Sequence, residues 1–173
     1  MDAPGTKDAA VLVPLYRSSG VWHALFTKRR NDLEQHAGEI SFPGGRQDEA
    51  DEDLRRTALR ESEEEIGLPS SQVELVGALP PIGTFVTSYT VYPFVGVIDE
   101  GLTWTLQPTE VEQVLEHSLP ALVAGHEMKR LLRKGVPFKT PTYTVDGTFV
   151  WGATARILQL LLERVQPLIE PAG

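Results

Sequence analysis

Residues 60–68 read Arg60-Glu61-Ser62-Glu63-Glu64-Glu65-Ile66-Gly67-Leu68. The apolar residues before this run have helical spacing, which predicts a helix over residues 53–66 that ends at Gly67. Along such a helix, Glu64 and Glu65 lie about 60° and about 40° to either side of Glu61. These three carboxylates therefore share one arc of the helix surface, whereas Glu63 points away.

Like charges on one arc repel each other, and each such pair destabilises an isolated helix by ~0.2–0.5 kcal/mol. A divalent cation would remove this cost, and oxygen-only ligands suit Mg²⁺ or Mn²⁺. Arg60 precedes Glu64 by four residues, so it can orient a carboxylate that binds a metal. The alternative is an ordinary acidic helix face in contact with solvent.

Other hydrophobic patterns predict the elements around this helix. Strands are expected over residues 9–16, 21–27, 73–79, 89–98 and 111–115, with a hairpin of 138–145 and 148–151. Helices are expected over 119–124 and 153–165, and Pro93 indicates an edge or a bulge in its strand. Strands and helices do not alternate strictly, which favours an α+β fold with a mixed sheet between helices. We expect one domain over residues 1–173, with a core of about 9–166.

Composition excludes several classes of protein. The chain has 173 residues, no cysteine, and 16 basic against 24 acidic side chains, which gives a net charge of −8. This balance argues against binding to nucleic acid duplexes, which needs a basic face, and no apolar run reaches the ~18 residues of a membrane span. The N-terminal residues do not resemble a secretory signal, and the lack of cysteine suits a reducing compartment. We therefore expect a cytoplasmic protein that acts on a small molecule, and a homodimer is compatible with the sequence.

The acidic stretch resembles the second half of the Nudix box, G-x(5)-E-x(7)-R-E-U-x-E-E-x-G-U, where U is an aliphatic residue. Ser62 stands at one of the aliphatic positions. The first half of the box is one residue longer than the pattern. Counting forward from Gly45 places Asp51 at the early acid, whereas counting back from Arg60 places Glu52 there. The sequence leaves this choice open.

A second resemblance lies upstream, in the residues Leu25-Phe26-Thr27-Lys28-Arg29, Gly38 and Phe42-Pro43-Gly44-Gly45. They are similar to the signature of the coenzyme A pyrophosphatase branch of Nudix hydrolases, although Arg30 and Glu34 replace its Ser and its second Arg. The resemblance implies an α/β/α sandwich that hydrolyses coenzyme A or acyl-CoA to 3′,5′-ADP and (acyl-)4′-phosphopantetheine. One alternative is another Nudix substrate: a nucleoside triphosphate, ADP-ribose or a dinucleotide polyphosphate. A different alternative is a nucleotide-binding module without catalysis.

The resemblance also implies roles for individual residues. Mg²⁺ or Mn²⁺ would be held by Glu61, Glu65 and Glu64, together with a backbone carbonyl near Gly45. Arg60 would orient these ligands, and the general base would be Glu64 or a later acid, for which Glu110 is the candidate and Glu112 the reserve. The residues expected to meet the substrate and its phosphates are Arg29, Arg30, Arg46, Gly44 and Phe42.

Overall fold

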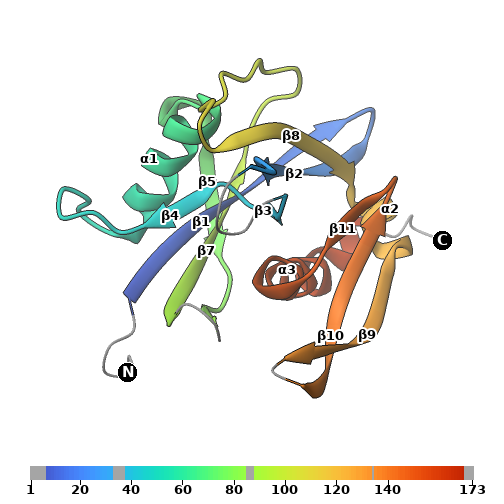
Figure 1. Ribbon diagram of the computed structural model, residues 1–173. Helices are drawn as coiled ribbons and strands as arrows, with labels where there is room; N and C mark the ends of the chain where they lie inside the picture. Colours follow the sequence, from blue (N-terminus) through green and yellow to red (C-terminus); the bar gives the residue numbers. More distant parts are fainter. Residues whose placement is uncertain (1–6, 33–37, 85–87, 134, 170–173) are drawn as a thin grey trace.

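The computed structural model describes residues 7–32, 38–84, 88–133 and 135–169 (Figure 1). The strands are β1 Lys7–Ser18, β2 Val21–Arg29, β3 Ile40–Ser41, β4 Gly44–Arg46, β5 Glu74–Ala78, β6 Ile82–Gly83, β7 Tyr89–Val97, β8 Val111–Ser118, β9 His126–Arg133, β10 Val136–Val145 and β11 Thr148–Val150. The helices are α1 Leu54–Ile66, α2 Leu119–Ala124 and α3 Gly152–Ile169, with a short 3₁₀ turn at Ser70–Gln72.

Strand β1 is the centre of an eight-stranded mixed sheet. It pairs with β2 and β4 in the antiparallel sense and with β7 in the parallel sense, where Lys7 faces Tyr89 and Leu15 faces Val97. Strands β3 and β8 pair with β2, and strands β5 and β6 pair with β7. The predicted mixed sheet is confirmed.

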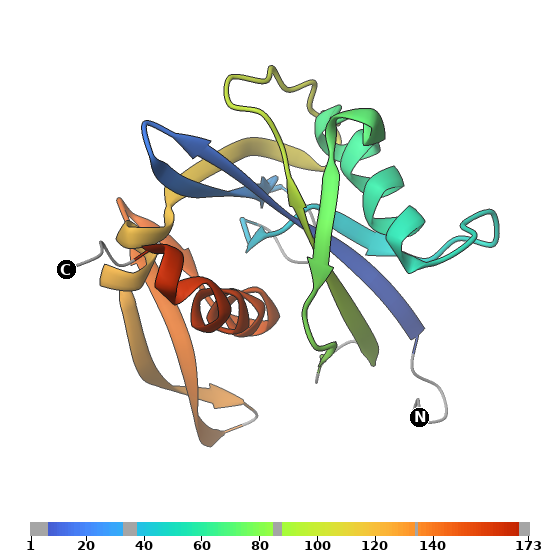
Figure 2. The same cartoon turned by 180° about the vertical axis from the view of Figure 1, so that it is seen from behind.

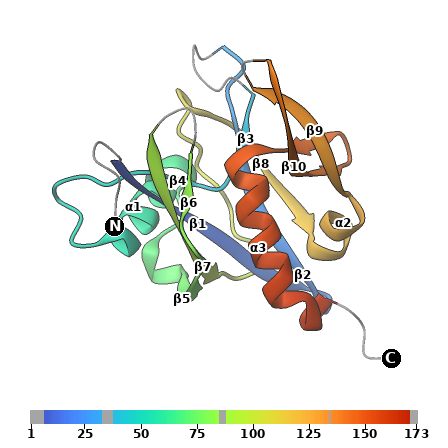
Figure 3. The same ribbon diagram turned by 90° about the horizontal axis from the view of Figure 1, so that it is seen from below.

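Alternate residues of the central strands feed two separate cores, one on each face of the sheet. Ala10 and Leu12 of β1 pack with α1, whereas Val13 and Leu15 pack with α3. Seen from below in Figure 3, α1 and α3 lie on opposite sides of the sheet. This arrangement confirms the expected α+β sandwich, with helices on both faces.

A second sheet contains three strands in the order β11-β10-β9. Helix α3 lies between this small sheet and the main sheet (Figure 2). The sequence predicted the hairpin of β10 and β11 but not β9. Strand β9 lies at the edge of this sheet and has large exposed side chains, among them Leu132.

Two prolines lie in surroundings that the sequence did not predict. Strand β7 lies inside the sheet rather than at its edge; Pro93 faces Val11 of β1, at the point where β5 gives way to β6 on the other side. Helix α3 continues through Pro167 to Ile169. The lost hydrogen bond lies near the helix end, where Val165 and Ile169 still pack against the core. None of the helices in the described ranges has the length and apolarity needed to cross a membrane.

Candidate active site

Helix α1 carries the predicted acidic residues and is fixed at both ends. Asp53 is its N-cap, with a side-chain oxygen 2.9 Å from the backbone N–H of Arg56. Gly67 ends it with φ of 73°, in the left-handed region that suits glycine. Its buried side chains are Thr57, Ala58, Ser62 and Ile66, and Ala58 and Ile66 belong to the core between this helix and the sheet. Ser62 stands where the box pattern has an aliphatic residue, and its hydroxyl donates to the carbonyl of Ala58 at 2.7 Å.

Strand β4 brings two glycines against α1. The backbone N–H of Gly44 donates to Glu65 Oε2 at 3.2 Å. A Cβ on Gly45 would lie 2.5 Å from Cδ of Glu61, so only glycine lets this carboxylate approach the strand so closely. A Cβ on Gly44 would lie 2.3 Å from the carbonyl oxygen of Ala10 on β1. Gly44 is therefore required by the sheet, and Gly45 by the acidic side chain.

Arg60 organises the acidic face of α1 and identifies the early acid. Its Nε and Nη2 donate to Oδ1 and Oδ2 of Asp51 at 2.8 and 2.9 Å. Its Nη1 donates to Glu61 at 3.0 Å and to Glu64 at 3.2 Å. Asp51 is buried, whereas Glu52 is exposed. Asp51 therefore holds the position that the sequence left open between these two acids, and the extra residue of the box lies after it.

Asp51 receives further hydrogen bonds that sequence reasoning did not predict. The hydroxyl of Thr57 and the backbone N–H of Asp48 both donate to its Oδ2 at 2.9 Å. The Arg60 guanidinium is the largest cause that holds the pKa of Asp51 well below its usual range. The carboxylate in turn raises the pKa of Arg60, which remains a fixed cation. No spacing rule in the sequence points to Thr57.

Two carboxyl groups of the cluster resist ionisation. Burial raises the pKa of Glu65 to about 8, and the negative charges of Glu61 and Glu110 add to this effect. Burial also raises the pKa of Glu61, against the opposing effect of Arg60. The charge of Glu110 thus acts on both groups, so the loop before β8 brings this acid near α1.

The donor chemistry of this cluster fits a hard divalent cation. It offers carboxylate oxygens, it includes a half-buried Glu65 whose charged form is disfavoured by burial, and the missing Cβ of Gly45 lets the Glu61 carboxylate approach β4. In the described part of the chain, no three His, Cys, Asp or Glu side chains form a ready-made metal-binding group. Arg60 holds Glu61 and Glu64, and Gly44 holds Glu65, so a cation has to displace or share these contacts.

The basic residues predicted to meet phosphates lie in different surroundings. Arg29 is half-buried, its charge lowers the pKa of Glu65, and its Nε is buried without a hydrogen-bond partner among the described groups. Arg46 lies over the ring of Tyr89, with its guanidinium carbon 5.6 Å from the ring centroid. Lys28, which precedes Arg29 in the same signature, pairs with Glu112 at 3.3 Å. Of these three cations, Arg29 is the one whose charge lowers the pKa of Glu65.

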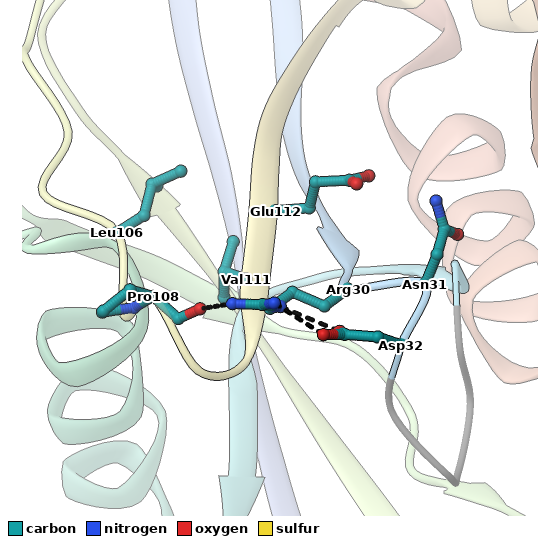
Figure 4. A pocket seen from close by; sticks show the side chains of 7 residues that line it. All are labelled: Arg30, Asn31, Asp32, Leu106, Pro108, Val111 and Glu112. Atoms are coloured by element: carbon teal, nitrogen blue, oxygen red, sulfur yellow. Dashed lines mark hydrogen bonds and ion pairs between the residues drawn. The ribbon is translucent and has the colours of Figure 1, made fainter.

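The structure corrects the expectation for Phe42 and shows that Arg30 has contacts within the protein. Phe42 is only 3% exposed and stacks on Phe26 with ring centroids 4.8 Å apart, so it belongs to the core rather than to a substrate surface. Arg30 has its guanidinium occupied within the protein by Asp32 and by the carbonyl of Pro108. Arg30, Asp32 and Pro108 line a pocket of about 510 Å³ beside the loop of Glu110 (Figure 4). Glu34 lies outside the described residues.

Comparison with known proteins identifies the family to which the chain belongs. The model of the NUDIX domain matches residues 6–137. The uncharacterized Nudix hydrolase NudL of Salmonella paratyphi B is 39% identical over 159 residues, which cover 90% of this chain and 81% of that protein. The chain therefore belongs to the Nudix family of hydrolases, which act on phosphoanhydrides and generally need divalent metal ions.

Solved structures share the fold at low sequence identity. The NUDIX domain of Shewanella oneidensis NrtR complexed with ADP ribose has a TM-score of 0.64 at 15% identity, covering 94% of this chain and 90% of that one. A MutT/nudix family protein from Enterococcus faecalis has a TM-score of 0.66 at 14% identity, covering 96% and 64%. A C. elegans Ap4A hydrolase binary complex has a TM-score of 0.57 at 19% identity, covering 69% and 85%.

Proposed function

We propose that this protein hydrolyses the diphosphate of coenzyme A or its acyl derivatives to 3′,5′-ADP and (acyl-)4′-phosphopantetheine, with Mg²⁺ or Mn²⁺. The observation that carries the hydrolytic part is the position of Glu65 and Glu61 beside the two glycines of β4. The substrate part rests on the signature that leads into this turn, from Leu25 to Gly45, and on its resemblance to the coenzyme A pyrophosphatase branch.

The acidic residues divide into ligands and a proton acceptor. Glu61 and Glu65 would hold the metal, with the backbone carbonyl of Gly45 as a further oxygen donor. When bound, the cation neutralises diphosphate oxygens and lowers the pKa of the attacking water. Glu64 is the most exposed of the three glutamates on this arc, and it is the first candidate for the group that takes the proton of that water. Glu110 is the second candidate, since its charge acts on both ligands.

Arg60 and Arg29 would orient or neutralise negative groups and would not transfer protons. Arg60 contacts Asp51 on one side, and Glu61 and Glu64 on the other, so it fixes the direction in which these two glutamates point. The charge of Arg29 acts on Glu65, so this guanidinium would offset the charge of a diphosphate bound at the same place. Arg46, which lies over the ring of Tyr89, is the second candidate cation for a contact with the substrate phosphates.

An assay of product formation tests this proposal. Coenzyme A is incubated with the protein and Mg²⁺ or Mn²⁺, and release of 4′-phosphopantetheine is the expected result. The same assay with ADP-ribose, a nucleoside triphosphate and a dinucleotide polyphosphate provides the comparison. Cleavage of one of these with no cleavage of coenzyme A would reject the substrate but keep the chemistry.

A second candidate function is therefore hydrolysis of another nucleoside diphosphate derivative. It is favoured by two similar structures, since one is described as a complex with ADP ribose and another as an Ap4A hydrolase. It is also favoured by Glu34, which would repel a phosphate at a position where the signature has arginine. A module without catalysis is the third reading, and retention of all three box glutamates argues against it.

A further inference from the structure

The loop before β8 is tied to α1 through its backbone. The N–H of Thr105 donates to the carbonyl of Ile66 at 3.0 Å, and that of Gln107 donates to the carbonyl of Glu65 at 2.8 Å. The carbonyl of Gln107 then accepts from the N–H groups of Glu110 and Val111. This side of the loop is thus anchored next to the metal-binding carboxylates, and Glu110 lies at its end.

Arg30, the residue that follows β2, holds the other side of the same loop. Its backbone N–H donates to the carbonyl of Glu110 at 3.0 Å. Its Nη1 donates to the carbonyl of Pro108 at 2.5 Å. Figure 4 shows the guanidinium between the Pro108 carbonyl and the carboxylate of Asp32.

Asp32 fixes the direction of this guanidinium. Its Oδ1 accepts from Nε at 2.9 Å and its Oδ2 from Nη2 at 2.6 Å, a two-point contact that leaves Nη1 facing the loop. A single exposed ion pair contributes little to stability. Here, however, the pair aims a third donor at Pro108, two residues before Glu110.

We infer that Arg30 is a positioning residue of this enzyme: its guanidinium, oriented by Asp32, holds the Pro108–Glu110 loop against α1, so that Glu110 is fixed on the loop whose backbone contacts Glu65. This inference rests on the proposed function, because it gives Glu110 a part in the metal-dependent reaction. It replaces the expectation that Arg30 meets a substrate phosphate. The charge of Glu110 raises the pKa of Glu61 and of Glu65, which agrees with this placement of the loop.

The test is a double-mutant cycle between Arg30→Ala and Glu110→Gln in the full chain. Arg30→Ala keeps the backbone N–H but removes the contact to Pro108, so we expect kcat to fall roughly 10-fold and the Mg²⁺ concentration for half-activation to rise by a similar factor. KM for the nucleotide substrate stays within about twofold. In the Glu110→Gln background, Arg30→Ala has no further effect on either quantity.

Two controls accompany the cycle. Arg55→Ala removes the same kind of exposed arginine, which pairs with Asp53 two residues away, and leaves kcat and Mg²⁺ activation unchanged. Asp32→Asn weakens the orientation of Arg30 and lowers kcat in the same direction, by a smaller factor. Thermal unfolding shows whether Arg30→Ala folds. If it does not fold, Asp32→Asn tests the role of Arg30 in its place.

Several results overturn the inference. One is a rise in KM that depends on salt while kcat is unchanged, because it indicates a phosphate contact. Another is an equal loss from Arg30→Ala with and without Glu110→Gln, and a third is wild-type behaviour of Asp32→Asn. Glu65→Gln in the same assay separates the two proposals: if it keeps wild-type activity, the metal-dependent function itself fails, whatever Arg30 does.

Discussion

Arg60 and Asp51 form a two-point ion pair, with Nε 2.8 Å from Oδ1 and Nη2 2.9 Å from Oδ2. The pair joins the loop before α1 to the acidic face of that helix. Arg60 then extends to Glu61 and Glu64 through its remaining nitrogen. The side-chain positions of Glu61 and Glu64 therefore depend on the ion pair between Arg60 and Asp51.

Asp51→Asn is expected to destabilise the protein by about 2 kcal/mol at neutral pH, because it leaves charged hydrogen bonds of Arg60 without an anionic partner. The pKa of Asp51 is lowered by folding, so its contribution is complete above its unfolded value of 3.8 and is lost as the pH falls through the lower folded value. The difference from wild type should therefore shrink below about pH 4. Urea unfolding at a series of pH values measures this.

Glu52→Gln is the matched control for Asp51→Asn, because Glu52 is the exposed neighbour that sequence counting offered for the same role. It should leave the free energy of unfolding within about 0.5 kcal/mol of wild type. Equal losses in the two variants would contradict the assignment of Asp51.

Glu65→Gln is expected to raise the stability of the metal-free protein at high pH and to lower its turnover. Folding raises the pKa of Glu65 to about 8, so the wild-type protein without metal loses stability as the pH rises from 4.5 through 8. The variant lacks this loss and should melt roughly 2–4 °C higher than wild type at pH 9 in chelator, equivalent to ~1 kcal/mol. Excess Mg²⁺ should reverse the order, because it stabilises only the carboxylate form.

The measurement for Glu65 is the melting temperature against pH, with and without Mg²⁺, alongside turnover. Turnover of the variant should fall by orders of magnitude. A variant that melts below wild type at pH 9 in chelator would show that the carboxylate carries no penalty in the folded state. A stabilising effect of Mg²⁺ of equal size in both proteins would place the metal elsewhere.

Alanine substitutions at three glycines should have three different effects. Gly45→Ala directs a Cβ at the flexible Glu61 carboxylate, so we expect the fold to persist and metal-dependent turnover to fall about 10–100-fold. Gly44→Ala meets the backbone of Ala10 and should lower stability first. Gly77→Ala has nothing within 4 Å of the new Cβ and serves as the control, with neither property changed.

These variants are compared by thermal unfolding and by the Mg²⁺ dependence of turnover. If Gly45→Ala hydrolyses substrate at the wild-type rate, the close approach of Glu61 to Gly45 is not needed for metal-dependent turnover. The same follows if Gly77→Ala loses as much turnover as Gly45→Ala does.

Phe42→Ala should act on stability rather than on substrate affinity. The ring is buried and stacks on Phe26, so its removal is expected to cost about 3–5 kcal/mol. Urea unfolding measures the cost, and KM of the folded fraction should stay near the wild-type value. Phe42→Leu keeps most of the volume and should cost less; a raised KM with unchanged stability would restore the role in substrate binding.

Local patterns in the sequence predict the fold well where the interactions are local. The span of α1, its end at Gly67 and the bounds of α2 follow from spacing, capping and turn residues. Strand β9 was missed because its charged residues lie at the edge of a small sheet, where no alternation marks a buried face. Pro93 suggested an edge strand, whereas β7 is paired on both sides. The break between β5 and β6 that lies opposite Pro93 belongs to those strands, and the sequence of β7 gives no sign of it.

The same limit applies to the site. Helical geometry is enough to bring Glu61, Glu64 and Glu65 onto one arc, because their positions depend on one element. The partners of Arg60 and Arg30 depend on loops that meet only in the folded chain, so Asp51, Thr57 and Pro108 have no signal in spacing alone. Phe42 has an aromatic side chain in a signature motif, and only its burial distinguishes a core role from contact with substrate.

The parallel pairing of β1 with β7 has a consequence for how the chain folds. Lys7 must find Tyr89, so the centre of the sheet closes only after a long segment has been synthesised and its loop-closure entropy has been overcome. Helix α1 leaves the ribosome before its supporting sheet is complete, with its mutually repelling carboxylates already present. Substitutions that weaken the β1–β7 contact should therefore slow refolding, even where they leave every residue of the acidic cluster untouched.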